Sequence, residues 1–432
     1  MKVYISPEIT GIQIYRYVLA LVFFNKNIDF EFTENRDLAE LKVTLGSESD
    51  FIINNDFYND LIGERYSHEF HFKDSPYIKT STDEVDLLST IFYCVNMIQE
   101  YNAKSNDFLK RFEFENSYQN KYNLIEVNHV QNCIDQLFSS TTKLSLIQMK
   151  PRKSSFLLSH DIDTVYGSLK EDGYHSLKHG KLGDLFGIII RHFFSNPDWL
   201  CMDKIMKIEN DFEFNSIFYW LLEKGKLNSD YSFHNKRIQQ QYKLAQNAGW
   251  GNGLHKSLSD KSIDDELSCM INPISSNRFH FLNYNLPSGF KLLTASKIKL
   301  DSSVGFTEKF GFRNSYGLPF IPFNFGNQTL HNFLEVPMHI MDRTFYRDKV
   351  NPKEVVRKLI DWFEKNRFNT LFVLNFHNNF FSNFKYNGYI QIYKEILEYF
   401  KQSNFSCNTF DSIMSGYYDI QKKIMEDGRK GE

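Results

Sequence analysis

The pattern of apolar and polar positions changes near residue 150. From there to about residue 420, short apolar runs alternate with stretches of helical periodicity. Such alternation is typical of βα units, in which helices cover a parallel sheet or barrel. We therefore predict an α/β fold with a barrel over residues 151–420. The apolar runs are SFLLS, SIFYWLL, GWGNGLH, IKLDSS and LFVLNFH, and the helical segments include HNKRIQQQYKLAQNA and PSGFKLLTASK.

The region before residue 150 has a less regular pattern. We expect a helix over roughly residues 10–25, strand-like pieces at LKVTLG and FIINND, and a helix within VDLLSTIFYCVNMIQEY. These elements predict a smaller α/β accessory domain over residues 1–100. Residues 101–150, with one expected helix in LIEVNHVQNCIDQLF, are interpreted as a connecting segment that ends near Met149–Pro151. Residues 421–432 are expected to form a charged, frayed tail.

Polar side chains follow several of the apolar runs. In parallel α/β folds, functional groups gather at the carboxyl ends of strands. Asp161 and Asp163 are two residues apart, so on a strand they point to the same face and can share one cavity. One carboxylate would then bind a cation while the other acts as a base. The alternative is a pair of loop or helix-capping aspartates. The other strand-end candidates are His255, Asp301 and His377.

Histidine and arginine side chains extend this set. A neutral imidazole at His255 is a suitable zinc ligand, and one at His377 is a suitable proton donor near neutral pH. Alone, a strand-end histidine such as His255 is more often structural or solvated, and His377 is also compatible with a satisfied core residue. Arg278 and His280 in NRFHFLNYNLP, and Arg313 in GFRNSYGLPF, are further candidates. An arginine can hold a carboxylate ionised or bind an anionic part of a substrate.

Composition narrows the functional classes. The net charge of −3 and the absence of a long basic run argue against nucleic acid as a partner. The five cysteines are far apart, which indicates no disulfide framework and no CxxC zinc site. No apolar stretch reaches 18 residues and the N-terminus lacks the features of a signal peptide, so we expect a cytoplasmic protein without a transmembrane segment. No GxSxG elbow or P-loop is present, which argues against serine hydrolases and NTP-dependent enzymes.

The order of the polar motifs is more specific than any one of them. LLSHDID, GLHKS, RFHFLNYNLP, LDSSVGFTEKFGFRNSYGLPFIPF and LNFHNN occur in this order along the chain. Together they resemble the polysaccharide deacetylase family, the NodB-like carbohydrate esterases, over roughly residues 150–400. The chain looks most like the branch that has an extra N-terminal domain. The resemblance implies a distorted (β/α) barrel with fewer than eight strands, and a divalent metal, often zinc.

The resemblance also implies roles for individual residues. It makes Asp161 the catalytic base and Asp163 a metal ligand, and it makes His255 the first of two metal-binding histidines. Arg278 would orient the base, and His377 would act as the general acid.

Two positions depart from the family pattern. Ser259 stands where the second metal-binding histidine is expected, and the arginine motif lacks its RxP form. His280 would fill the missing ligand position from the next strand, or water would. The remaining alternative is a site that binds metal weakly or not at all.

These features predict metal-assisted removal of acetyl groups from an N-acetylated sugar or glycan precursor, with Arg313 and Asp301 as substrate-binding groups. In the cytoplasm such a substrate would be lipid-linked, nucleotide-linked or a soluble oligosaccharide. The main alternative is a weakened or inactive barrel that binds a glycan or a partner enzyme in surface-polysaccharide assembly. A third is a carbon–nitrogen hydrolase that needs no metal. The sequence does not indicate the oligomeric state.

Overall fold

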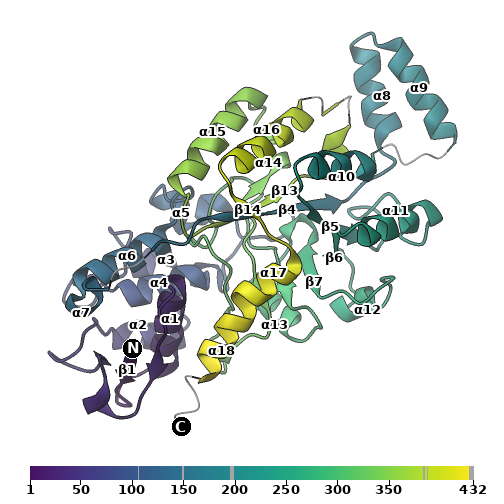
Figure 1. Cartoon of the computed structure of the whole chain (residues 1–432). Helices are drawn as coiled ribbons and strands as arrows, with labels where there is room; N and C mark the ends of the chain where they lie inside the picture. Colours follow the sequence, from purple (N-terminus) through teal and green to yellow (C-terminus); the bar gives the residue numbers. More distant parts are fainter. Residues whose placement is uncertain (106, 148–149, 195–198, 383–384, 387, 428–432) are drawn as a thin grey trace.

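A curled parallel sheet lies at the centre of the computed structural model, which describes residues 1–105, 107–147, 150–194, 199–382, 385–386 and 388–427 (Figure 1). Within these ranges the sheet has nine strands, ordered β11-β8-β7-β6-β5-β4-β13-β12 with β14 beside β4, and every pair is parallel. The predicted α/β class is therefore confirmed. The strands are β4 Ser155–Ile162, β5 Ser216–Leu221, β6 Gly251–Lys256, β7 Ser276–Phe279, β8 Leu300–Asp301, β11 Leu334–Glu335, β12 Ile340–Met341, β13 Leu371–Asn375 and β14 Ser406–Cys407.

One short segment closes the sheet into a distorted barrel. The two end strands, β11 and β12, are successive pieces of this segment. Between them, the backbone N–H of Met338 donates to Val304 O (2.8 Å), and the N–H of His339 donates to Val373 O (3.1 Å). The segment thus crosses from one edge of the sheet to the other. The strand count exceeds the expected number because four of the nine strands described in this sheet, β8, β11, β12 and β14, are only two residues long.

Helices cover the outer face of the sheet, so its longer strands are apolar on both faces. Strands β4, β5 and β13 are buried along their whole length. Helix α15 starts at Pro352, where the side chain of Asn351 caps Lys353 N, an arrangement that favours helix initiation. The α-helices described in this region are α8 Ser168–Lys178, α9 Leu182–Phe193, α10 Met202–Asp211, α11 Lys236–Asn247, α12 Ile263–Leu267, α13 Ser288–Thr294, α14 Asp342–Arg347, α15 Pro352–Lys365, α16 Tyr389–Gln402, α17 Phe410–Ile413 and α18 Asp419–Asp427.

The N-terminal region forms the lower left of Figure 1 and has a small parallel sheet, β2-β1-β3. The two predicted helices are present as α1 and α4. The strand expected at FIINND is wrong, because Asn54 accepts a bond from Phe57 N and so caps a helix. The elements are β1 Lys2–Ile5, α1 Ile12–Asn25, β2 Glu31–Phe32, β3 Leu41–Val43, α2 Asn55–Ile62, α3 His68–Phe72, α4 Leu87–Val95, α5 Tyr118–Lys121, α6 His129–Ser140 and α7 Thr142–Ser145.

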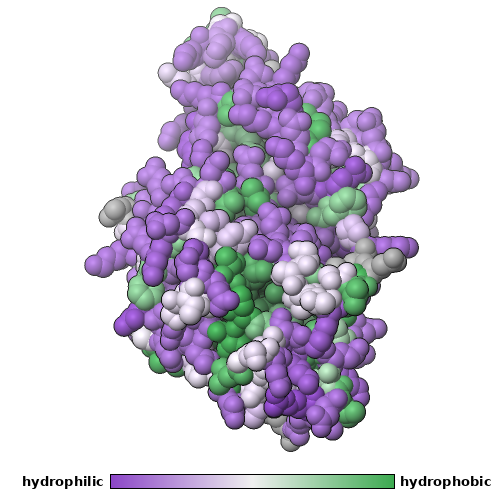
Figure 2. All heavy atoms as spheres, turned by 90° about the vertical axis from the view of Figure 1, so that its left-hand side faces the viewer, coloured by the Kyte–Doolittle hydropathy of each residue, from purple (hydrophilic) through white to green (hydrophobic). Residues whose placement is uncertain are grey.

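The N-terminal region packs directly on the barrel. A continuous hydrophobic core runs through both, and buried polar bonds join them. Tyr17 Oη donates to Ile321 O (3.0 Å), and Arg313 pairs with Glu100 (2.6 Å). Figure 2 shows that the outer face of the molecule on this side is mostly hydrophilic, with apolar side chains gathered near its middle.

Part of the C-terminal tail predicted over residues 421–432 is described by the structure. Residues 421–427 lie in α18, where Gln421 is buried and accepts from Ile321 N (3.0 Å), so this part of the expected tail is helical. Residues 428–432 and Met149, at the predicted boundary, lie outside the described residues. The described helices include none long and apolar enough to cross a membrane.

Candidate functional site

The carboxyl ends of four strands bring the predicted catalytic and metal-binding residues to one place. Asp161 lies near the end of β4, and Asp163 follows it. His255 lies in β6, and His280 and His377 follow β7 and β13. All five side chains are buried and line a cavity of about 450 Å³. Asp161 and Asp163 thus face the same cavity, as expected for two residues spaced by one along a strand.

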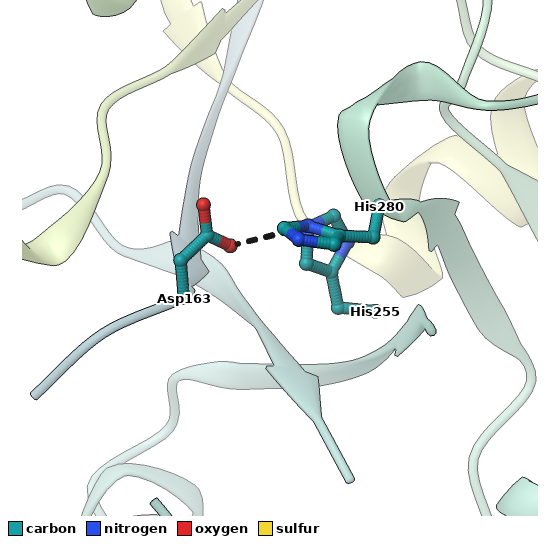
Figure 3. Close-up of side chains that lie close together, drawn as sticks. All are labelled: Asp163, His255 and His280. Carbon is teal, nitrogen blue, oxygen red and sulfur yellow. Dashed lines mark hydrogen bonds and ion pairs between the residues drawn. The ribbon is translucent and has the colours of Figure 1, made fainter. Parts of the chain in front are cut away.

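Asp163, His255 and His280 point toward one another (Figure 3). Asp163 Oδ1 lies 3.4 Å from His255 Nε2 and 3.6 Å from His280 Nδ1, and the two nitrogens are 3.1 Å apart. In a tetrahedral zinc site with bonds of about 2.0–2.2 Å, neighbouring ligand atoms are about 3.3–3.6 Å apart. The three atoms are thus spaced as three ligands of one small divalent cation.

The chemical state of Asp163 and His280 also suits a cation, whereas Asp161 and Asp163 raise the pKa of His255 despite its burial, so a cation would have to displace a proton there. His255 Nδ1 lies 2.9 Å from Arg278 O, a contact that directs Nε2 toward the cavity when Nδ1 carries the proton. Burial lowers the pKa of His280 to about 3, which keeps this imidazole neutral. Despite its burial, Asp163 has a pKa well below the ordinary value because His280, His255, His377 and Arg343 surround it. Asp163 Oδ1 is buried without a hydrogen-bond partner in the described structure, so a lone pair is open toward the histidines.

Asp161 is held as a carboxylate beside the ligand triad. Arg278 Nη1 donates to its Oδ1 (2.9 Å), and Asn375 Nδ2 donates to its Oδ2 (2.7 Å). Burial alone would raise the pKa of Asp161, but His255, Arg278 and His377 together lower it below the ordinary value. Its Oδ2 lies 3.6 Å from His255 Nε2. An ionised carboxylate in this position can accept a proton from a molecule bound next to the triad.

Arg278 is itself held rigidly. The guanidinium is fully buried and lies 4.5 Å from the ring centroid of Tyr219. Its Nε donates to Ser302 O (2.9 Å), and its Nη2 donates to Ser302 Oγ (3.1 Å). The register of β6 and β7 places Arg278 opposite His255. The arginine side chain therefore aligns Asp161, while its backbone carbonyl aligns His255 of the triad.

His377 lies on the other side of the carboxylates and is oriented by Asp342. Its Nδ1 lies 2.7 Å from Asp342 Oδ1, and its backbone N–H donates to Asp342 Oδ2 (2.6 Å). Its Nε2 faces Asp163 Oδ2 at 3.6 Å and Asp161 Oδ2 at 4.0 Å. With Nδ1 directed to Asp342, Nε2 is the nitrogen that faces the carboxylates in the cavity.

Sequence reasoning did not identify Asp342 or Arg343. Both begin α14 directly after β12, a two-residue strand that leaves no periodic signal in the sequence. Arg343 Nη2 donates to Asp163 Oδ2 (3.2 Å). Arg347 and Lys385 add further positive charge to the cavity wall, and Lys385 pairs with Glu171.

The other sequence candidates lie elsewhere. Ser259 Oγ donates to Glu266 Oε1 (2.9 Å) in the loop after β6 and does not line the cavity. Arg313 is buried against Glu100 at the junction with the N-terminal region. Asp301 is buried in β8, where it accepts from Asn277 Nδ2 (2.6 Å). Neither Arg313 nor Asp301 is part of the cavity lining, so nothing in this geometry supports their predicted contact with a substrate.

Comparisons with known proteins give the following. No protein-family model and no curated protein matches the sequence. Similar solved structures include a candidate polysaccharide deacetylase from Mycobacterium smegmatis (11% identity, 61% of this chain and 96% of that chain, TM-score 0.35) and the polysaccharide deacetylase Bc1974 from Bacillus cereus (9% identity, 60% and 94%, TM-score 0.33). They also include a 4-alpha-glucanotransferase from Thermococcus litoralis (11% identity, 61% and 40%, TM-score 0.38).

The structures from Mycobacterium smegmatis and Bacillus cereus are both named as polysaccharide deacetylases, the family that the sequence motifs resemble. At such low identities and TM-scores the likeness carries no argument about activity. The case for a function rests on the geometry of the site.

Proposed function

We propose that this protein is a metal-dependent carbohydrate deacetylase, which hydrolyses the acetamide group of an N-acetylated sugar or glycan precursor. The proposal rests on three kinds of groups that lie together in one cavity: metal-binding side chains, an oriented carboxylate and an oriented imidazole. A triad spaced for a divalent cation lies next to a carboxylate aligned by Arg278 and an imidazole aligned by Asp342. Such a pair of oriented groups is what hydrolysis of an amide requires, a base for water and an acid for the amine.

Asp163, His255 and His280 are the residues that would hold the metal, which we expect to be zinc. When bound there, a divalent cation supplies Lewis acidity toward the acetyl carbonyl and favours ionisation of water. Replacement of any of these side chains would weaken the site directly.

The chain's own residues would move the protons. Asp161 accepts the proton of the attacking water, whose oxygen forms the new bond to the acetyl carbon. His377 Nε2 donates a proton to the sugar nitrogen as the carbon–nitrogen bond breaks, and acetate and a free amine result. Each such proton transfer contributes typically about 10²- to 10⁴-fold to the rate. Arg278 and Asn375 keep the base ionised, and Asp342 stabilises the imidazolium.

The cavity wall supports a sugar as the substrate. A volume of about 450 Å³ lies within the usual range of small-ligand sites, about 300–1,000 Å³. The rings of Phe281, Tyr346, Phe380 and Tyr386 line it and offer apolar faces for the carbon–hydrogen faces of a pyranose.

The test is acetate release from N-acetylglucosamine oligomers by the metal-free protein and after addition of zinc. We expect activity to depend on zinc and to fall about 10²-fold or more in Asp161→Asn. Ser259→Ala, which removes a hydroxyl outside the cavity, is the matched control and should retain activity. Equal activity of Asp161→Asn and the wild type, or full activity with a chelator, would refute the mechanism.

One contact favours the alternative of a barrel that binds glycans without turning them over. Arg343 donates to Asp163 Oδ2, so a guanidinium already partners one of the expected ligands. This alternative predicts that zinc binds no more tightly to the wild type than to His255→Ala, while the oligomers bind equally well to the wild type and to Asp161→Asn.

A further inference from the structure

The hairpin formed by α8 and α9 exposes an unusual number of large apolar side chains. Eight of the large hydrophobic residues that are exposed in the described part of the chain fall between residues 174 and 194. The hairpin projects from the barrel at the upper right of Figure 1. These residues are Tyr174, Leu177, Leu182, Phe186, Ile189, Ile190, Phe193 and Phe194.

The apolar residues of α9 form one stripe. Leu182, Phe186, Ile189 and Phe193 follow one another at intervals of four, three and four residues, which places them on one helix face. Their exposed fractions reach 84% at Phe193. Ile188, by contrast, is fully buried. The helix therefore has apolar groups on its inner side and a second apolar surface turned to the outside.

Positive charge accompanies this stripe. Lys170, Lys178 and Lys181 are exposed, and the last two flank the turn between the helices. The acidic groups of α8 are engaged elsewhere. Glu171 pairs with Lys385, and Asp172 is fully buried and accepts from Trp199 Nε1. Among the described side chains of the hairpin, Asp184 is thus the acidic group that is both exposed and without a basic partner.

We propose that the α8–α9 hairpin docks on an anionic lipid surface, with the stripe of α9 inserted at the level of the headgroups. An amphipathic helix with basic flanks lies in the plane of such a surface and buries its apolar face about 5–10 Å deep. At about 1.5 Å per residue, the 12 residues of α9 span about 18 Å, too short to cross the hydrocarbon core.

Charge distinguishes lipid from a second copy of the chain. In a symmetric dimer the same patch meets itself, so Lys178 and Lys181 of both copies would face only Asp184 as an exposed acidic group of the described hairpin, and the joined surface would carry excess positive charge. An anionic membrane pairs these lysines with negative charge instead.

Docking would also orient the catalytic cavity. Glu171 of α8 lines that cavity together with Lys385 and Arg343, so the base of the hairpin forms part of the cavity wall. A lipid-borne substrate would then approach along the same side. This inference goes beyond the deacetylase proposal and does not require it, because docking can be measured without any activity.

The test is co-sedimentation of the full-length protein with vesicles of phosphatidylcholine alone, or with about 30% phosphatidylglycerol added. We expect binding to the anionic vesicles that weakens as salt is raised. Phe186→Ser/Phe193→Ser should lower this affinity at least about tenfold. Lys178→Glu/Lys181→Glu should abolish the preference for anionic vesicles. Phe70→Ser/Phe368→Ser removes two exposed phenylalanines outside the hairpin and should bind as the wild type does.

Two results would overturn the proposal. The first is absence of vesicle binding by the wild type, or equal binding by the wild type and Phe186→Ser/Phe193→Ser. The second is a wild type that sediments as a dimer and ignores vesicles, while the same double variant is monomeric, because the stripe would then be a self-association surface. Unchanged thermal unfolding of the variants confirms that the exposed substitutions leave the fold intact.

Discussion

Replacement of His280 by alanine tests the candidate metal centre at the position where the sequence departs from the expected pattern. His280 Nδ1 lies 3.1 Å from His255 Nε2 and 3.6 Å from Asp163 Oδ1, so it completes the triad. Ser259, the residue at the expected ligand position, is bound to Glu266 instead. We therefore predict that His280→Ala loses zinc affinity and that Ser259→Ala does not.

The size of the effect follows from the geometry. Loss of a group that only supports a ligand costs about 10- to 100-fold in metal affinity, and loss of a ligand costs at least as much. We therefore expect the Kd for zinc to rise at least 100-fold in His280→Ala, equivalent to about 2.7 kcal/mol. At a free zinc concentration of about 100 times the wild-type Kd, binding stabilises the folded wild type by about 2.7 kcal/mol. For 432 residues this is a rise in Tm of about 3 °C, which the variant should lose.

The assay is a zinc titration by calorimetry on metal-free protein, together with thermal unfolding with and without zinc. His280 is buried, so the unfolding of the metal-free variant shows whether the substitution damages the fold by itself. His280→Gln, which keeps more of the side-chain volume, is the second variant. Wild-type zinc affinity in both His280 variants, or a loss of affinity in Ser259→Ala, would refute the assignment of His280.

Two further predictions concern the general acid and the N-terminal region. Asp342→Asn should lower acetate release about 100-fold or more at saturating zinc, because the partner that orients His377 is lost, whereas the Kd for zinc should stay the same; activity within twofold of wild type would contradict this. Burial raises the pKa of Asp86 from 3.8 to about 6. The folded protein therefore holds the carboxyl proton more tightly than the unfolded chain does. The resulting stabilisation is complete below about pH 4 and is lost as the pH rises through 6. Asp86→Asn keeps a helix-capping side chain but has no buried charge, so it should be more stable than the wild type by up to about 3 kcal/mol at pH 8 and not at pH 4. Urea unfolding at the two pH values measures this difference. An equal difference at both pH values would contradict burial of the Asp86 charge as its cause.

The longer strands of the barrel were predictable because both of their faces are covered. SFLLS, SIFYWLL and LFVLNFH are apolar runs since β4, β5 and β13 lie between the barrel interior and the outer helices. The two-residue strands were not predictable in this way, because a pair of residues has no periodicity. This limit matters for function, since Asp342 follows one of them.

Polar residues inside the barrel depend on partners that only the tertiary structure reveals. Strand β7 reads Ser-Asn-Arg-Phe, which is a weak strand pattern by composition. Two of its polar side chains have buried acidic partners: Asn277 donates to Asp301, and Arg278 donates to Asp161. Likewise, an apolar helix such as α9 reads in sequence as one packed on a core, and the sequence does not tell which of its faces is turned outward.

A serine at position 259 and a histidine at position 280 illustrate the same limit at the candidate metal centre. A sequence motif records ligands that are close along the chain, whereas a cation requires only that they be close in space. Parallel pairing of β6 with β7 places His255 beside Arg278, and the chain then turns so that His280 faces His255.

The loop after β6 is meanwhile held away from the cavity. Glu266 accepts bonds from Lys256 Nζ, Ser257 Oγ and Ser259 Oγ, so the residue at position 259 is tied to α12. In this arrangement the third imidazole or carboxylate of the candidate triad comes from His280, directly after β7, and not from the loop that Glu266 holds.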